Sequence, residues 1–203
     1  MSAVLEKIAV RNLGRVEYAD AWHAMKKFSS ERKDSTPDEL WLVEHSPVYT
    51  LGQGCDEVAV KNGIPVVRSD RGGEITYHGP GQIVLYALID LARRGIKVKQ
   101  FVALLEQAVI DLMGGRAERR PGAPGVYVGG AKIAALGIRV TRGRSYHGLA
   151  LNVDMDLAPF AAIDPCGFPG LQVTQTKDLG FRKNRKEIED ELVKNVIAGI
   201  ENA

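Results

Sequence analysis

The chain has 203 residues, of which 45% are hydrophobic and 26% charged, and its formal net charge is +2 at pH 7. This length and composition predict one globular domain over residues 1–203, with enough apolar residues for a sizeable core. So small a net charge gives no strong field that would attract nucleic acid or an anionic membrane, and we expect neither as a partner.

Cysteine and histidine usage limits the function classes further. Cys55 and Cys166 lie far apart and form no four-ligand cluster with the four histidines, so we expect no metal site. Glu6, Lys7 and Arg11 interrupt the first residues, which therefore lack the pattern of a secretion signal. No apolar run approaches the length that spans a membrane. We expect a cytoplasmic protein.

The first half of the chain predicts short strands around one helix. Strands are expected at residues 7–11, 40–44, 64–67 and 83–89, where short apolar runs occur. A helix is expected over residues 16–28, because five side chains recur there at helical spacing: Tyr18, Ala21, Trp22, Met25 and Phe28. The polar residues 29–39 predict a solvated loop, and residues 46–55 a connecting segment.

The second half predicts two helices that flank a group of strands. Helices are expected over residues 98–113 and 186–200, and strands at 126–128, 131–140 and 146–153. Gly129-Gly130 is a hairpin signal between the first two of these strands. Strands dominate the middle and the helices come singly. We therefore predict an α+β fold, with a mixed or antiparallel sheet core covered by a few helices.

Residues 71–82 form a glycine-rich stretch between two apolar runs, with the sequence Arg71-Gly72-Gly73-Glu74-Ile75-Thr76-Tyr77-His78-Gly79-Pro80-Gly81-Gln82. Glycine loses more backbone entropy on folding than any other residue, so such a cluster needs a reason. One interpretation is a pair of tight turns around a short strand. The other is that backbone or ligand approaches closely there.

Cys166 is the stronger candidate for covalent chemistry. It follows Pro165 and precedes Gly167, which favours a turn with little bulk beside the thiol. The residue is either a nucleophile, with backbone amides available for a developing oxyanion, or a small hydrophobe buried in a loop. Cys55 is weaker, because the acidic Asp56 beside it disfavours a thiolate.

A nucleophilic cysteine needs a base, and His78, His147 and Lys132 are the candidates. Both histidines lie next to a glycine near a predicted strand. Strict alternation over residues 131–140 would place Lys132 on one apolar face with Ala134, Leu136, Ile138 and Val140. Such a lysine either lies at a frayed strand end with its ammonium in water, or is buried. Burial favours the neutral amine, which can accept a thiol proton.

Four motifs, in the same order, resemble the signature of the lipoyl(octanoyl) transferase family. They are Arg71-Gly72-Gly73-x-x-Thr76-Tyr77-His78-x-x-Gly81-Gln82-x-Val84-x-Tyr86, Gly130-Ala131-Lys132-Ile133-Ala134-Ala135-Leu136-Gly137-Ile138, His147-Gly148-Leu149-Ala150-Leu151-Asn152-Val153 and Pro165-Cys166-Gly167. The resemblance covers nearly the whole chain. One departure follows the last motif, where Gln175-Thr176 stands in place of the family's Ser-Leu.

This resemblance implies an enzyme that moves an octanoyl group from octanoyl-acyl carrier protein to a lysine of lipoyl domains. The acceptors would be the lipoyl domains of 2-oxoacid dehydrogenases and the glycine cleavage H protein, and no cofactor is implied. Cys166 would form an acyl-thioester, and Lys132 would exchange protons with it. The implied acyl-substrate residues are Arg71, Gly72, Gly73, Glu74, Ile75, Thr76, Tyr77, His78, Ala135, Leu136, Gly137, Gly148, Leu149 and Ala150. The implied fold is the α+β catalytic domain of lipoate and biotin protein ligases.

Three other functions fit parts of this pattern. An ATP-dependent lipoate-protein ligase needs no cysteine nucleophile, a cysteine thioesterase uses water in place of the acceptor amine, and an acyl-binding module performs no chemistry. Two further points stay open. Arg71 and His78 either contact substrate or brace the site. Five arginines either dock an acidic carrier protein or form a solvated face: Arg116, Arg119, Arg120, Arg142 and Arg144.

Overall fold

The computed structural model describes residues 7–56, 60, 62–163 and 170–203. Its main sheet has seven strands, in the order β1 (Ala9–Val16), β2 (Glu39–His45), β6 (Gln82–Leu88), β10 (Arg144–Asn152), β9 (Ala131–Thr141), β8 (Val126–Val128) and β7 (Glu118–Arg119). β1 and β2 are parallel, and every other neighbouring pair is antiparallel. The sheet is therefore mixed, which confirms the predicted fold class.

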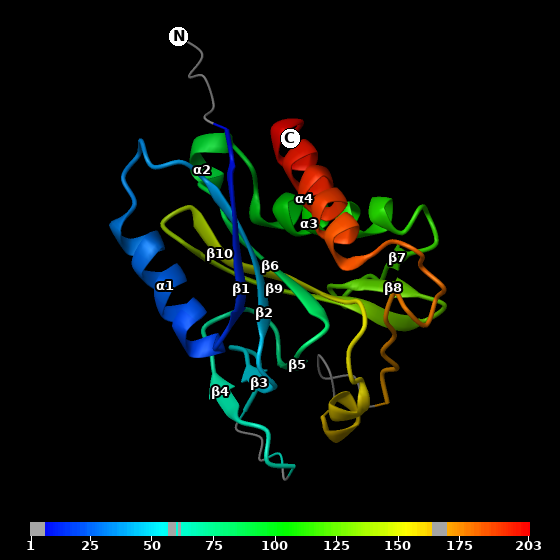
Figure 1. The fold of residues 1–203 in the computed structure, drawn as a ribbon. Helices are drawn as coiled ribbons and strands as arrows, with labels where there is room; N and C mark the ends of the chain where they lie inside the picture. The colour runs from blue at the N-terminus through cyan, green and yellow to red at the C-terminus, as the bar shows by residue number, and fades with distance from the viewer. Residues whose placement is uncertain (1–6, 57–59, 61, 164–169) are drawn as a thin grey trace.

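A smaller sheet and five helical segments complete the described fold (Figure 1). The smaller sheet has the order β4 (Val66–Arg68), β3 (Val48–Leu51) and β5 (Ile75–His78). The helical segments are α1 (Tyr18–Glu31), α2 (Leu91–Arg94), α3 (Val98–Leu112), the 3-10 helix η1 (Ala158–Ala162) and α4 (Arg185–Glu201).

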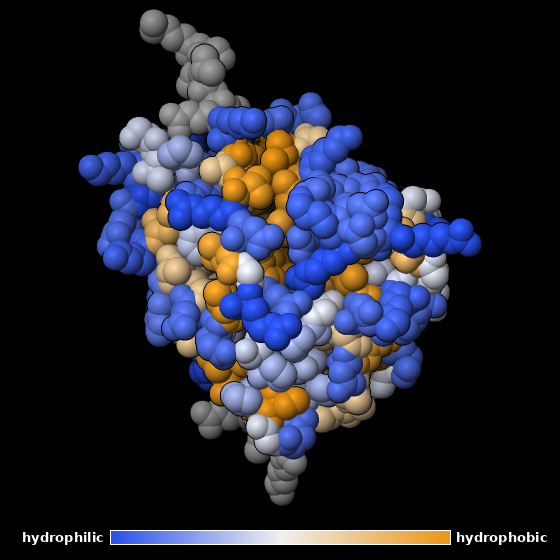
Figure 2. Space-filling view, viewed as in Figure 1, coloured by the Kyte–Doolittle hydropathy of each residue, from blue (hydrophilic) through white to orange (hydrophobic). Residues whose placement is uncertain are grey.

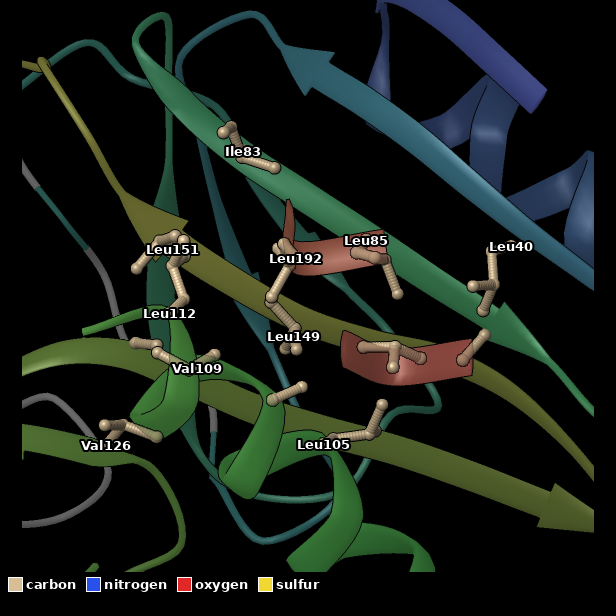
Figure 3. Packing of buried hydrophobic residues seen from close by; sticks show 14 of the residues in the cluster. Leu40, Ile83, Leu85, Leu105, Val109, Leu112, Val126, Leu149, Leu151 and Leu192 are labelled. Atoms are coloured by element: carbon tan, nitrogen blue, oxygen red, sulfur yellow. The ribbon is translucent and has the colours of Figure 1, made fainter. Parts of the chain in front are cut away.

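Both faces of the main sheet are covered, and β6 shows how the sequence achieves this. Its residues Ile83 and Leu85 belong to the hydrophobic cluster that includes α3 and α4, whereas Val84 and Tyr86 belong to the cluster that includes α1. Figure 3 shows leucines and valines of the sheet and of α3 and α4 meeting in the first cluster. A strand buried on both faces is expected to be a nearly continuous apolar run, as β6 is from Ile83 to Leu88.

Hydrophilic residues cover most of the outer surface of α4, and hydrophobic residues are visible in a strip beside that helix (Figure 2). Among the described residues, no helix is both long enough and apolar enough to cross a membrane.

The structure corrects three predicted segments and adds one strand. The predicted solvated loop over residues 29–39 is confirmed only at residues 33–37, because α1 continues to Glu31 and the Asp38 carboxylate is fully buried. Residues 46–55 contain the strand β3, and β1 continues past residue 14 to Val16 with a register shift at Gly14. The short strand β7 was not predicted at all.

Asp38 is buried because three arginines surround it. Arg32, Arg93 and Arg94 each bind its carboxylate, at 2.7, 2.8 and 2.5 Å. Burial by itself would raise the pKa of Asp38, but the hydrogen bonds from Arg32 and Arg94 and from the Asp90 backbone outweigh it and lower that pKa. The carboxylate therefore joins the end of α1, the start of β2 and α2.

Candidate active site

A narrow pocket lies on the α1 face of the main sheet, beneath residues 71–78. We call it the slot. Its floor is built from small residues, because Ala135 lies opposite Ala150 and Gly137 lies opposite Gly148 in the β9–β10 pair. The slot has a cavity volume of about 40 Å³, or about 480 Å³ when all space between its atoms and the open solvent at its mouth are counted. A mainly apolar pocket of this shape suits a slender apolar ligand.

The predicted acyl-substrate residues gather at this slot, with two exceptions. The residues that line it are Arg71, Gly73, Glu74, Ile75, Thr76, His78, Ala135, Leu136, Gly137, Gly148, Leu149 and Ala150. Gly72 lies at its edge instead, where its N–H donates to the carbonyl of Ile138 over 3.0 Å. The Tyr77 ring packs away from the slot, against Tyr49 and Phe160.

Close backbone approach explains the glycines at the start of the glycine-rich stretch and on β9. A Cβ at Gly137 would lie 2.8 Å from the Gly72 carbonyl oxygen and 3.3 Å from Cδ of Arg71. A Cβ at Gly52 would lie 2.1 Å from the Gly73 carbonyl oxygen. A side chain at Gly137 would push residues 71–73 away from β9, and one at Gly52 would push Gly73 away from the end of β3. Within the stretch itself, a Cβ at Gly72 would lie 3.1 Å from the Ile138 carbonyl oxygen, so the close-approach interpretation holds here.

Arg71 braces the wall of the slot. Its buried guanidinium donates from Nε to Thr50 Oγ1 over 2.9 Å, and from its terminal nitrogens to the carbonyls of Gly72 and Glu74 over 2.9 and 2.6 Å. These bonds tie the turn at residues 71–74 to β3. Because these N–H groups already donate to backbone carbonyls, Arg71 has a bracing role in the fold.

His78 is a buried and neutral part of the same wall. Its Nδ1 is 2.7 Å from Gln82 Oε1, and its ring stacks on Tyr18 with 6.0 Å between the centroids. Burial lowers the pKa of His78 to about 3, because desolvation penalises the charged ring. The imidazole therefore stays uncharged at neutral pH.

His147 and Asp70 lie together at one end of the slot. Nε2 of His147 is 2.8 Å from Asp70 Oδ1, which also accepts from Trp22 Nε1, while Oδ2 accepts from the Tyr146 hydroxyl. Burial would raise the pKa of Asp70, but hydrogen bonds from His147, Tyr146 and Trp22 outweigh it and hold that pKa well below its usual range. Desolvation lowers the pKa of His147.

Sequence reasoning placed none of four further lining residues in the acyl-substrate site: Tyr18, Val84, Tyr86 and His147. His147 was a candidate base only. Val84, Tyr86 and His147 stand inside the family motifs, so their positions carried a signal. The only sequence signal for Asp70 was its position directly before Arg71.

Lys132 does not lie on the face that alternation predicts. In the β8–β9 pair, Val126 lies opposite Ala134 but Tyr127 lies opposite Lys132, so Ile133 is an extra residue on β9. Ile133 and Ala134 both enter the cluster with α3 and α4, which is the behaviour of a β-bulge. The bulge reverses the phase of the strand, and Lys132 points to the side of Tyr127, away from that cluster.

The Lys132 side chain is buried, with only 3% of the residue exposed. Its Nζ donates to the carbonyl of Pro124 over 3.2 Å and lies 5.2 Å from the centre of the Tyr127 ring. The frayed-end interpretation is therefore wrong. An aromatic face and a carbonyl oxygen hold the nitrogen of this lysine in place.

The backbone of Lys132 pairs with the segment that follows the fourth family motif. Its N–H donates to the Gln172 carbonyl over 2.8 Å, and its carbonyl accepts from the Thr174 N–H over 3.0 Å. Cys166 lies outside the described residues. Cys55 is free and half-buried, and packs beside the cluster that contains Tyr77. Within the described ranges, no group of three or more histidines, cysteines or acidic residues could hold a metal ion.

The five arginines do not form one surface. Arg142 and Arg144 lie at the β9–β10 turn, and Arg144 pairs with Asp34 and Asp90. The other three lie toward the opposite end of β9: Arg116, which stacks on Phe181, Arg119, which pairs with Glu106, and Arg120, which stacks on Tyr127.

Comparison with known proteins places the chain in a family. The model of the lipoyl protein ligase A/B catalytic domain matches residues 17–197. The chain belongs to this family. Among curated relatives, the octanoyltransferase of Aromatoleum aromaticum is 58% identical over 92% of this chain and 83% of its own length. That of Thiobacillus denitrificans is 59% identical over 90% and 86%. These relatives confirm the resemblance to lipoyl(octanoyl) transferases.

Solved structures of the lipoyl protein ligase A/B family and its neighbours share the fold. A lipoate-protein ligase A crystallised with ATP superposes with a TM-score of 0.79 at 15% identity, over 97% of this chain and 86% of that one. The biotin protein ligase of Aquifex aeolicus gives 0.59 at 11% identity, over 96% and 71%. Both confirm the predicted likeness to ligase catalytic domains.

Proposed function

We propose that this protein is an octanoyltransferase that moves an octanoyl group from octanoyl-acyl carrier protein to a lysine of a lipoyl domain, through an acyl-thioester on Cys166. The observation that carries the proposal is the slot, whose floor of alanines and glycines fits an unbranched acyl chain. Curated relatives of over 50% identity, all named octanoyltransferases, support the same acyl group.

The pairing of Lys132 with Cys166 is supported by the described residues around the cysteine. Ile163 and Val173, on either side of residues 164–169, both pack in the cluster of Tyr49 and Tyr77. Val173 also forms a bridge with Lys132. Both flanks of the Cys166 segment are thus anchored in one cluster, and one of them pairs with the backbone of Lys132.

In the first half-reaction, the Cys166 thiol attacks the carbonyl of the donor thioester. Lys132 accepts the thiol proton and the carrier protein's thiolate leaves, taking that proton in return. One thioester is exchanged for another, so the step needs no ATP. Because the thiolate is the nucleophile, a lysine beside it accelerates attack both as a proton acceptor and as a counter-charge.

In the second half-reaction, the acceptor lysine must attack as a neutral amine. Its nitrogen forms the amide bond, the Cys166 thiolate leaves, and the proton lost by the amine passes to Lys132 and then to the thiolate. A general base contributes about 10²–10⁴-fold in such a step. An acidic carrier protein would dock near Arg116, Arg119 and Arg120, which lie at the Lys132 end of β9.

Intact-protein mass spectrometry without ATP tests this function. We expect incubation with octanoyl-acyl carrier protein to add one octanoyl group, and subsequent addition of a lipoyl domain to remove it. Cys55→Ser, the matched control, is expected to behave as the wild type, and Cys166→Ser to lose the adduct. Transfer that needs ATP would indicate a ligase, and release of free octanoate without transfer would indicate a thioesterase.

A further inference from the structure

One nitrogen at the end of the slot has no hydrogen-bond partner. Nδ1 of His147 is fully buried, and no atom of the described residues binds it. The residue lines the slot and is 1% exposed. A buried polar atom without a partner is costly, so its presence in a pocket wall points to a ligand group that satisfies it.

The hydrogen bond to Asp70 fixes what this nitrogen can do. Oδ1 of the ionised Asp70 only accepts hydrogen bonds, so Nε2 of His147, 2.8 Å away, carries the proton. The imidazole is neutral because burial opposes its charge. Nδ1 therefore presents a lone pair, and the missing partner is a hydrogen-bond donor.

Neighbouring hydroxyls cannot supply that donor, because their protons are used elsewhere. Nδ1 of His45 donates to the Val16 carbonyl, so its Nε2 accepts from the Tyr86 hydroxyl over 2.6 Å. The Tyr18 hydroxyl donates to Ser69 Oγ over 2.6 Å. The donor has to come from the occupant of the slot or from a trapped water.

The position of His147 indicates which part of an occupant it meets. His147 lies opposite Ile138, six residues along β9 from Lys132, and the slot-lining residues 135–137 lie between these two positions of the strand. If the acyl group is attached near Lys132, as the proposed function holds, its other end reaches toward His147. The apolar floor of the slot thus ends at a hydrogen-bond acceptor, Nδ1 of His147.

We propose that His147, positioned by Asp70, is a specificity-determining residue that accepts a hydrogen bond from a donor at the far end of a medium-chain acyl group. The slot then takes chains of about octanoyl length that carry a terminal hydroxyl or thiol, in addition to the plain chain. This inference rests on the proposed function, because it takes the reacting carbonyl to lie at the Lys132 end.

A hydroxyl scan on the wild-type enzyme tests the inference without any substitution. Carrier protein loaded with 8-hydroxyoctanoyl, 6-hydroxyoctanoyl or nonanoyl groups would be compared by kcat/KM for transfer to a lipoyl domain. We expect the 8-hydroxy chain to exceed the 6-hydroxy chain by about threefold to tenfold, the range of one buried hydrogen bond. Equal values for the two hydroxyl positions would overturn the inference.

Two variants then assign the effect to His147. The nonanoyl and 8-hydroxyoctanoyl chains have the same shape, so their ratio cancels general damage to the site. We expect His147→Phe to lower the 8-hydroxyoctanoyl to nonanoyl ratio by about threefold to tenfold. His147→Asn keeps an oxygen at the depth of Nδ1, and Asn tolerates the positive φ of 61° at this position. It is expected to retain part of the preference.

Asp70→Asn tests whether Asp70 positions His147. The amide of the new Asn can donate to Nε2 of His147, which favours the other tautomer, with the ring proton on Nδ1. We expect the same fall in the ratio, which compares two chains of the same shape and so does not depend on how much transfer the variant keeps. A ratio unchanged in all three variants overturns this inference alone. Loss of octanoyl transfer by the wild-type protein would overturn the proposed function and this inference with it.

Discussion

Lys132 lies directly opposite Tyr127 in the β8–β9 pair, with its ammonium nitrogen 5.2 Å from the centre of the phenol ring. Tyr127 is itself fully buried, and its hydroxyl donates to the Ala123 carbonyl. Ring and carbonyl together restrict the rotamers of the Lys132 side chain, so that about 2 kcal/mol of side-chain entropy is lost on folding and not when substrate binds. The terminal nitrogen is therefore held in position before any substrate arrives.

Replacing this ammonium should abolish acylation without unfolding the protein. Lys132→Met keeps the length of the stem and removes the charge, and we expect the rate of octanoyl adduct formation to fall by about 10²–10⁴-fold. Rapid-quench mass spectrometry measures that rate. Lys99→Met, on an exposed position of α3, is the matched control and should acylate normally. An undiminished rate in Lys132→Met would refute the proton-transfer role.

A methyl group at Gly137 should disturb the wall of the slot. Its Cβ would meet the Gly72 carbonyl at 2.8 Å, so residues 71–73 must move, and we expect Gly137→Ala to lower the free energy of unfolding by about 1–3 kcal/mol. Urea denaturation measures the change. In the control Gly199→Ala, the new Cβ makes only ordinary contact with Leu104, and helix propensity should raise stability by up to about 1 kcal/mol. Equal effects of the two substitutions would contradict the close-approach argument.

A larger side chain on the floor of the slot should shorten the acyl chain that the enzyme prefers. Ala150→Val adds bulk beside Ala135 and Val84, and each methylene excluded from the slot loses about 0.8 kcal/mol, or roughly fourfold in kcat/KM. We expect the preference to move from octanoyl toward hexanoyl carrier protein, measured by competition between the two donors. Ala24→Val, on the exposed side of α1, should leave it at octanoyl. An Ala150→Val enzyme that still prefers octanoyl would show that the acyl chain lies elsewhere.

The buried Asp38 should make stability depend on acid pH. Its pKa is lower in the folded protein than in the unfolded chain, so the ionised carboxylate stabilises the fold above about pH 4. That contribution is lost as the pH falls through the folded-state pKa. We expect Asp38→Asn to cost about 3–5 kcal/mol at pH 7, because three arginines lose their shared partner, and to cost less as the pH drops below about 4.

Urea titrations of the wild type and Asp38→Asn at pH 7 and near pH 3 measure this dependence. Asp34→Asn is the matched control, since its fully exposed carboxylate pairs with Arg144 in solvent and should matter little. A constant difference between Asp38→Asn and the wild type at both pH values would contradict the assignment.

Local pattern was enough to predict much of the fold. The stripe from Tyr18 to Phe28 predicted which side of α1 is buried, and the glycine pair at residues 129–130, with φ of 54° and 89°, forms the predicted hairpin. The helix face and the hairpin depend on residues close together in the sequence. The family motifs also contain most of the residues that line the slot, although the motifs themselves lie far apart in the sequence.

Features that depend on distant partners could not be predicted in this way. The Asp38 cluster draws its arginines from α1 and from the region of α2, more than fifty residues further on. The His147–Asp70 bond joins residues 77 positions apart. The face of Lys132 was predicted wrongly because the bulge at Ile133 exists only through the pairing of β9 with β8.

Because of that bulge, the register of β9, as well as its amino-acid sequence, determines on which face of the sheet the Lys132 side chain lies. One extra residue in β8 between Val126 and Tyr127 would give Ile133 a partner and restore strict alternation. Lys132 would then turn toward α3 and α4, although every side chain of the motif is kept. Alignments of related chains should therefore be inspected for one-residue insertions in β8 at this point. A homologue with such an insertion matches the signature and is expected to be unable to carry out the reaction.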